Sequence, residues 1–230
     1  MSSSATALGK RLLSAAEFVR QGAYFADIGT DHAYLPLFLL SEGKIPRAVC
    51  ADINRGPLES ARKNAESECL LEKIDFVLTD GAEGLSDRGI TDYAICGMGG
   101  ELIADIIKRS PHLSMPGVRL ILQPMTRAAH LRRYLAEGGF SVLDESYSSD
   151  GGKFYVCLCA EYTGECREIS EIEAELGTLS ERRALTDAER GYFDTRQRAL
   201  TRAARGKASQ NNGSSREALL LSELERRNLL

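Results

Sequence analysis

Acidic side chains stand where three successive apolar runs of this chain end. Asp27 and Asp31 lie at the end of the first run and just beyond it. Asp52 closes the second run, Asp80 follows the third, and the glycine-rich stretch 97–100 follows the fourth. The carboxyl ends of parallel strands meet at one edge of a sheet, where ligands bind. We therefore expect these residues to gather in one binding site.

A nucleoside cofactor would give each of these residues a role. Gly29 has no side chain, so the backbone can approach a ligand closely at this position. Asp52, 25 residues after Asp27, is placed to accept hydrogen bonds from both ribose hydroxyls, and Asp80 to accept one from the adenine amine. The first turn lacks the G-x-G-x-x-G pattern that binds a pyrophosphate. This absence favours a cofactor without a pyrophosphate, such as S-adenosylmethionine.

Strands and helices alternate between residues 22 and 162, which predicts a parallel sheet. Apolar runs predict seven strands, at 24–28, 48–53, 74–78, 92–96, 118–122, 140–145 and 154–159. Helical patterns lie between them at 35–41, 57–69, 100–108 and 127–137. The last two strands are joined by the turn-rich loop 146–153 without a helix, which predicts an antiparallel pair. This α/β layout is that of the class I, Rossmann-like S-adenosylmethionine-dependent methyltransferase fold, a seven-stranded sheet with an antiparallel last strand.

The composition is that of an ordinary globular chain. Its 230 residues are 43% apolar and 27% charged, which fits one large domain with an appendage. The longest apolar run, 35–40, is far shorter than the roughly 18 residues that a membrane span requires. The first twenty residues have the spacing of an amphipathic helix rather than of a signal peptide. Six cysteines without a C-x-x-C pair favour core thiols, no metal site and a cytoplasmic location.

The strand pattern stops after Tyr162. We therefore predict a methyltransferase domain at residues 1–162 and a C-terminal helical, coiled-coil-like domain at 163–230. Within the second domain, the Thr186 hydroxyl is expected to cap a helix that restarts there. A final helix is expected at 216–228, after a polar loop.

Charge is distributed unevenly in this C-terminal part. The net charge of −4 argues weakly against a nucleic-acid partner. However, segment 165–181 holds six acidic residues and one basic residue, whereas 182–207 holds eight basic and three acidic ones. Arg198, Arg202 and Arg205 recur at i, i+4 and i+7, so they share a helix face that could follow phosphates. Alternatively, the two segments pair with each other in a helical hairpin.

Four motifs carry a resemblance to a known family: Asp27-Ile-Gly-Thr-Asp-His-Ala-Tyr-Leu-Pro36, Gly97-Met-Gly-Gly100, Leu120-Ile-Leu-Gln-Pro124 and Asp150-Gly-Gly-Lys-Phe-Tyr155. From about residue 11 to residue 162, the sequence resembles the bacterial tRNA (adenine-22-N1)-methyltransferases, the TrmK family. The resemblance implies methyl transfer from S-adenosylmethionine to N1 of adenine 22 in the D-loop of tRNA. The family's Asn after Gln-Pro is Met125 here, and its acid after the late tyrosine is Val156. The pocket for the target base is therefore expected to differ in detail.

For such a reaction, the positions and chemistry of individual residues suggest their roles. Asp31 is the expected catalytic residue, because a carboxylate beside the base can stabilise the charge that develops on the adenine or accept a proton from its amine. We expect the cofactor to contact Arg11, Asp27, Gly29, His32, Asp52, Ile53, Asp80, Gly81, Gly97 and Met98. We expect tRNA to contact Tyr34, Gln123, Pro124, Arg127, Arg198, Arg202 and Arg205. Tyr34 would stack on an extruded base, and Arg127 belongs to a second basic cluster with His130, Arg132 and Arg133.

Each of these residues also has a plain structural interpretation. Asp31 could cap the helix that follows it, Asp80 and Gly81 could form an ordinary turn, and Arg11 could be a lone surface cation. At the level of function, the alternatives are a methyltransferase that acts on another RNA or on a small molecule, and an RNA-binding protein without catalysis. For the oligomeric state we expect a monomer.

Overall fold

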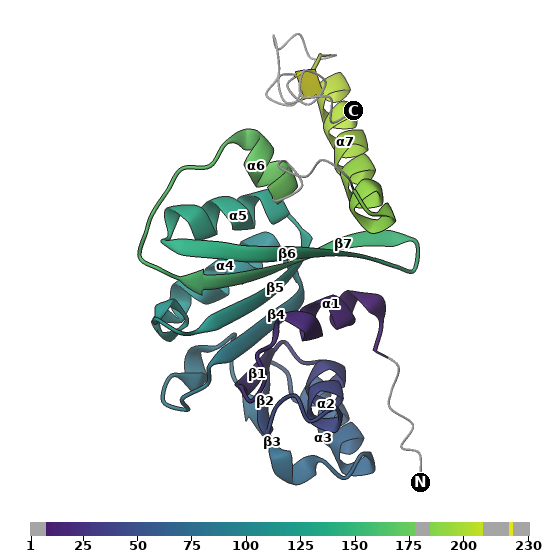
Figure 1. Cartoon of the computed structure of the whole chain (residues 1–230). Coiled ribbons are helices and arrows are strands. Elements are labelled where there is room, and N and C mark those ends of the chain that lie inside the picture. Colours follow the sequence, from purple (N-terminus) through teal and green to yellow (C-terminus); the bar gives the residue numbers. More distant parts are fainter. Residues whose placement is uncertain (1–7, 178–184, 209–220, 223–230) are drawn as a thin grey trace.

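A seven-stranded sheet forms the centre of the computed structural model, which describes residues 8–177, 185–208 and 221–222 (Figure 1). The strand order is β3-β2-β1-β4-β5-β7-β6. The strands are β1 (Tyr24–Ile28), β2 (Arg47–Asp52), β3 (Ile74–Leu78), β4 (Asp92–Gly99), β5 (Arg119–Thr126), β6 (Phe140–Asp150) and β7 (Lys153–Tyr162). The first five strands are parallel, and β7 is antiparallel to β5 and β6. The predicted methyltransferase fold is confirmed.

Helices cover both faces of the sheet. One face carries α1 (Lys10–Phe18), α2 (Tyr34–Ser41) and α3 (Arg55–Ser67), and the other carries α4 (Gly100–Arg109) and α5 (Ala128–Glu137). Short 3-10 turns lie at Leu71–Lys73, Glu83–Leu85 and Pro111–Ser114. Because both faces are covered, β1 is buried along its whole length. This burial is the physical reason for the near-continuous apolar runs that predict the strands.

The β6–β7 hairpin is longer than the sequence predicts. The expectation of a loop at 146–153 is wrong, because both strands continue to a two-residue turn at Gly151 and Gly152. These glycines have φ angles of 55° and 75°, in the left-handed region that a tight hairpin turn requires. The polar stretch before the turn is typical of a loop, but here it is part of β6. β6 is the edge strand of the sheet, so it pairs with β7 on one side and with no strand on the other.

The C-terminal part contributes α6 (Glu171–Leu176) and α7 (Asp187–Ala208). The predicted cap of α7 is present. The Thr186 hydroxyl accepts a hydrogen bond from the Glu189 N–H over 3.4 Å, and the Glu189 carboxylate accepts one from the Thr186 N–H over 2.7 Å. This reciprocal pair is a capping box, which satisfies two backbone donors at the start of the helix.

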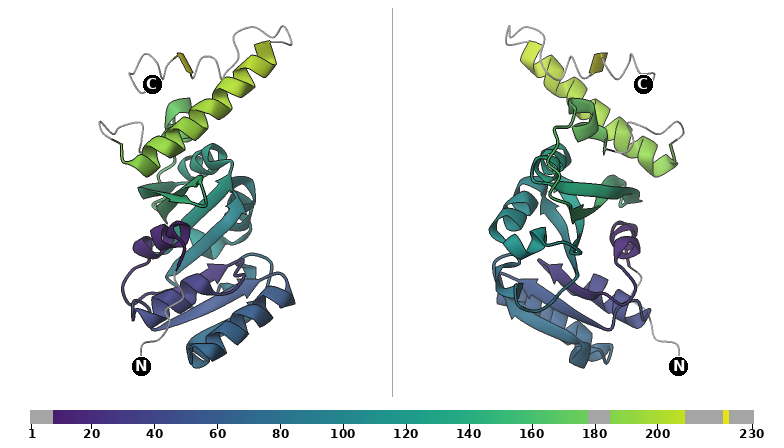
Figure 2. Two further views of the ribbon diagram at one scale, coloured as in Figure 1. Left: turned by 90° about the vertical axis from the view of Figure 1, so that its right-hand side faces the viewer. Right: turned by 60° about the vertical axis from the view of Figure 1, so that its left-hand side comes forward.

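Both C-terminal helices dock on the sheet domain. Figure 2 shows α7 beyond β6 and β7, at the end of the molecule opposite β3. Apolar side chains of α6 and α7 belong to the same core as the sheet, namely Ile172, Leu176, Tyr192, Phe193 and Leu200. The described helices α6 and α7 are therefore packed on the sheet domain, and a domain boundary at 162 stays a prediction.

Two further predictions concern the rest of the C-terminal part. The expected helix at 216–228 lies outside the described residues, apart from 221 and 222. The coiled-coil-like arrangement also stays a prediction. In the described ranges, no helix has the length and apolar character needed to cross a membrane.

Candidate active site

A cleft opens where β1 and β4 end, at the edge of the sheet that holds the carboxyl ends of its parallel strands. It encloses a cavity of about 330 Å³. The lining includes seven residues predicted for the site: Arg11, Asp27, Gly29, Asp31, His32, Tyr34 and Gly97. These residues come from α1, from β1 with the loop and helix after it, and from β4. Residues far apart in the sequence thus meet in one cavity.

Glycines shape the floor of this cleft. Gly29 and Gly97 have φ angles of 73° and 80°, which favour glycine over any residue with a side chain. A Cβ atom on Gly29 would also collide with the terminal methyl group of Met98. Both loops therefore present bare backbone to the cavity. An extended ligand that lies along a backbone needs such a cradle, and S-adenosylmethionine fits this requirement.

Asp27 is the buried carboxylate of the cleft. Burial raises its pKa from 3.8 to about 6, although the Thr30 hydroxyl and the Arg11 guanidinium oppose the shift. The carboxylate is therefore largely ionised at neutral pH, at a cost in desolvation that the protein tolerates. A buried acid whose pKa lies near the working pH is typical of functional sites.

Gln123 ties together two sides of the cleft. Its amide oxygen accepts a hydrogen bond from Arg11 Nη1 over 2.7 Å and another from the Gly97 N–H over 3.0 Å. The Gln123 side chain is fully buried, and Pro124 is buried. We expected both residues to contact tRNA, but their burial favours a positioning role. Tyr155, which enters the sequence analysis only as the end of a motif, also lies near this site, because its ring is 6.0 Å from the Arg11 guanidinium.

Asp31, His32 and Tyr34 form the exposed rim of the cleft. The Asp31 side chain is 78% exposed, and its Oδ2 lies 3.4 Å from His32 Nε2. The His32 ring stacks on the Tyr34 ring, with 5.2 Å between centroids. Asp31 does not cap α2: the cap position is Ala33, and no side chain caps the helix there. The capping interpretation of Asp31 is therefore wrong, and its carboxylate faces solvent at the mouth of the cleft.

The remaining predicted acids lie further along the same edge of the sheet. Asp52 ends β2, and its Oδ1 accepts a hydrogen bond from the Asn54 N–H over 2.7 Å. Ile53, next to it, is an exposed apolar residue. Asp80 and Gly81 follow β3, and both Asp80 oxygens accept hydrogen bonds from Arg109, over 3.1 and 3.2 Å. Arg109 also pairs with Glu83 and Asp105. Sequence reasoning did not single out this arginine clamp.

The residues predicted to contact tRNA lie on two surfaces. Arg127 immediately precedes α5 and lies at the rim of a second cavity, of about 520 Å³, which also reaches α7. This cavity is lined by Glu101, Met125, Thr126, Arg127, Ala129, His130, Arg133, Glu175 and Arg196. On α7, the predicted stripe of Arg198, Arg202 and Arg205 is exposed. Arg196 instead pairs with Glu175 of α6, so the acidic and basic segments do meet, but at a residue outside the stripe.

The prediction of a surface basic cluster on α5 is wrong for one of its members. Arg132 is not on the surface, because its side chain is only 3% exposed and pairs with buried Glu145. A helix presents neighbouring residues to different sides, so Arg133 stays partly exposed while Arg132 faces the core.

Comparisons with known proteins show the family of this chain. Residues 8–158 match the family model described as a methyltransferase domain. A Bacillus subtilis tRNA (adenine(22)-N(1))-methyltransferase is 38% identical over 154 residues, which is 67% of this chain and 65% of that protein. The chain thus aligns with slightly less than two thirds of that relative's length.

Solved structures cover nearly the whole chain. A candidate tRNA (m1A22) methyltransferase of Streptococcus pneumoniae, in complex with S-adenosyl-L-methionine, is 32% identical with a TM-score of 0.82, over 94% of this chain and 99% of that one. The Bacillus subtilis m1A22 tRNA methyltransferase TrmK is 29% identical with a TM-score of 0.78, over 96% of each chain. The chain therefore belongs to the methyltransferase-domain family and, within it, to the tRNA (adenine(22)-N(1))-methyltransferases.

Proposed function

We propose that this protein transfers a methyl group from S-adenosylmethionine to N1 of adenine 22 in tRNA, in the cytoplasm. The observation that supports this most is the cleft beside β1 and β4. It combines a glycine cradle, a buried carboxylate and an exposed carboxylate in a fold whose relatives have been solved with S-adenosylmethionine and with S-adenosyl-homocysteine. Two of the solved structures, similar in length to this chain, are named as a tRNA (m1A22) methyltransferase or a candidate for one.

Residues at successive strand ends would hold the cofactor. Asp52 would accept hydrogen bonds from the ribose hydroxyls, with Ile53 against the adenine and Asp80 near its amine. Arg11 and His32 would face the carboxylate of the methionine part. The remaining contacts would be made by backbone or by packing, at Asp27, Gly29, Gly81, Gly97 and Met98. When bound, S-adenosylmethionine supplies an electrophilic methyl group.

Asp31 is placed to assist the target base. N1 of adenine has a lone pair that can take the methyl group directly, and the ring then becomes cationic unless its exocyclic amine loses a proton. The Asp31 carboxylate lies at the mouth of the cleft, where it would accept a hydrogen bond from that amine and then its proton. His32, 3.4 Å from Asp31 Oδ2, would orient the carboxylate.

Tyr34 and the basic surfaces would bind the RNA. The Tyr34 ring is partly exposed beside Asp31, where it would stack on a base that has left the RNA stack. Arg127 lies at the cavity between α5 and α7, and the stripe of Arg198, Arg202 and Arg205 would follow the phosphates. We propose these contacts as the tRNA-binding surface.

Nucleoside analysis tests the proposal. Unfractionated tRNA is incubated with the protein and labelled S-adenosylmethionine, then digested and separated into nucleosides. We expect the label in 1-methyladenosine, and its loss when adenine 22 of a transcribed tRNA is replaced by guanine. Label in another nucleoside would point to another RNA target. No label in any tRNA would contradict the proposal and favour a small-molecule substrate or an RNA-binding protein without catalysis.

A further inference from the structure

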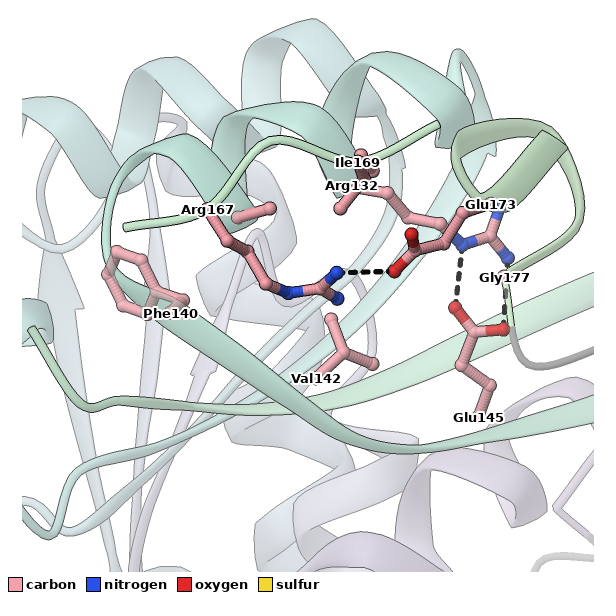
Figure 3. Close-up of a pocket in the computed structure, with 9 residues that line it drawn as sticks. Arg132, Phe140, Val142, Glu145, Arg167, Ile169, Glu173 and Gly177 are labelled. Atoms are coloured by element: carbon pink, nitrogen blue, oxygen red, sulfur yellow. Dashed lines mark hydrogen bonds and ion pairs between the residues drawn. The ribbon is translucent and has the colours of Figure 1, made fainter. Parts of the chain in front are cut away.

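A buried ion pair lies where the C-terminal helices meet the sheet domain. Arg132 on α5 and Glu145 on β6 are joined by two hydrogen bonds, Nε to Oε1 over 2.6 Å and Nη2 to Oε2 over 3.2 Å. Their side chains are 3% and 1% exposed. The pair forms one wall of a cavity of about 180 Å³ between α5, β6 and the chain that leads into α6 (Figure 3).

The same arginine holds the end of α6. Arg132 Nη1 donates to the carbonyl oxygens of Ala174 and Glu175, over 2.9 and 3.3 Å. The Tyr147 hydroxyl lies within hydrogen-bonding distance of Glu145 and of the Leu176 carbonyl oxygen. The last carbonyls of a helix have no partner within the helix. Here the Arg132 side chain of the sheet domain donates to these carbonyl oxygens, so the sheet domain stabilises the end of α6 at this position.

Gly177 fits the chain directly over this pair. It follows α6 with a φ angle of 57°, which a residue with a side chain rarely adopts. A Cβ atom there would collide with the carboxylate of Glu145 and with Nε of Arg132. The backbone at the end of α6 thus passes so close to the ion pair that only glycine fits.

A second contact holds α7 itself. Gly191 packs against the ring of Phe154 on β7, and a Cβ atom at that position would overlap the ring. The rings of Tyr192 and Tyr147 meet edge to face, with 5.1 Å between centroids. Tyr147 therefore contacts the Arg132–Glu145 pair on one side and α7 on the other.

We propose that Arg132, Glu145 and Gly177 are positioning residues that fix α7 relative to the methyl-transfer cleft, and so determine how tRNA presents its target base. This inference rests on the proposed function, because it requires α7 to bind the tRNA that the cleft methylates. A buried ion pair is a weak source of stability compared with apolar packing, whereas its directional bonds specify one geometry. A tRNA that contacts both the cleft and α7 requires that these two parts keep a fixed relative position.

The test compares two glycine variants of the full chain. Gly177→Ala places a methyl group against the ion pair. Gly89→Ala is the matched control, because Gly89 also has a positive φ, of 68°, but has no atom within 4 Å of the added Cβ. We measure affinity for S-adenosylmethionine by calorimetry, kcat and KM with tRNA, and hydrogen exchange of α6 and α7. An error of about 1 Å in placement can cost on the order of a hundredfold in rate.

For Gly177→Ala we expect kcat/KM with tRNA to fall by about ten- to a hundredfold, with faster exchange in α6 and α7 and unchanged affinity for S-adenosylmethionine. Kinetics equal to those of Gly89→Ala would overturn the inference, and so would a parallel loss of cofactor affinity, which indicates damage to the whole fold. If Gly177→Ala does not fold, Arg132→Lys replaces it, since lysine keeps the charge but cannot reach both carbonyls and Glu145. If the wild-type chain methylates no tRNA, the proposed function fails, while hydrogen exchange still tests the joint.

Discussion

The two carboxylates at the cleft, Asp27 and Asp31, differ in burial. Asp27 is buried and its charge is costly, whereas Asp31 is exposed and free to meet a substrate. Two carboxylates four residues apart thus have different environments, which would suit the different roles proposed for them. The sequence predicts both positions from the end of a strand. It cannot predict which carboxylate is buried, because burial depends on α1 and on β4, which are distant in the chain.

The buried charge of Asp27 predicts a specific pH dependence of stability. The pKa of Asp27 is raised by burial from 3.8 to about 6 in the folded protein, so the folded state binds the proton more tightly than the unfolded state. Its ionisation therefore destabilises the fold as pH rises through 4–6, by about 3 kcal/mol in full. Relative to the wild type, Asp27→Asn should gain stability over that pH range. Thermal unfolding at pH 4 to 8 checks this, and parallel curves for the two proteins would contradict it.

Asp31→Asn should separate binding from chemistry. The exposed carboxylate contributes little to stability, so the variant should unfold within about 0.5 kcal/mol of the wild type. Loss of the group that accepts the proton should lower kcat with tRNA by about 10²- to 10⁴-fold, while calorimetry shows unchanged affinity for S-adenosylmethionine. Asp87→Asn, an exposed carboxylate on a loop away from the cleft, is the control. Unchanged kcat in Asp31→Asn would remove Asp31 from the mechanism.

At the level of elements, the cleft depends on contacts between α1, β4 and β5. The amide oxygen of Gln123 on β5 accepts hydrogen bonds from the Arg11 guanidinium of α1 and from the Gly97 N–H of β4, and so joins the three elements. The sequence predicts all three elements, since apolar periodicity reports which side of each is buried. It does not predict that Gln123 joins them, because a glutamine after a strand is equally compatible with an exposed site.

Gln123→Leu tests this joint between elements. The substitution removes the acceptor that the Arg11 guanidinium and the Gly97 N–H share. It therefore loses two partly buried hydrogen bonds, worth about 1 kcal/mol for the neutral N–H and about 1.5–3 kcal/mol for the charged guanidinium. We expect affinity for S-adenosylmethionine to fall at least about tenfold, since 1.4 kcal/mol corresponds to a factor of ten. Gln21→Leu, on an exposed glutamine, serves as the control. Equal cofactor affinity in the two variants would show that Gln123 does not organise the cleft.

On the scale of the whole molecule, the cleft and the exposed arginines of α7 belong to one packed body. The core of the sheet continues into α6 and α7, and buried Arg132 links them. The sequence predicts the helical C-terminal part and its basic stripe from composition and spacing. It assigns Arg132 to the surface, because one-dimensional charge counting cannot tell which face of α5 the C-terminal segment covers.

The arginine stripe of α7 predicts how tRNA affinity depends on salt. Arg198, Arg202 and Arg205 are exposed and have no acidic partner among the described residues, so each is available to a phosphate. Replacing all three by Glu should weaken tRNA binding and lower the slope of log K against log salt by about 2–3, nearly one unit for each phosphate that the helix no longer binds. Affinity for S-adenosylmethionine should not change, because the cleft lies across the β6–β7 hairpin from α7.

A charge-matched control makes this result specific. Reversal of Arg62, Lys63 and Lys73, exposed on and after α3 at the opposite end of the sheet, changes the net charge by the same amount. If tRNA binding depended only on total charge, both triple variants would lose affinity equally. If the α7 reversal left tRNA affinity and its salt slope unaltered, the stripe would be only a solvated helix face. Loss confined to the α7 variant would place the RNA along that helix, because only phosphate contacts that release counterions locally change the slope.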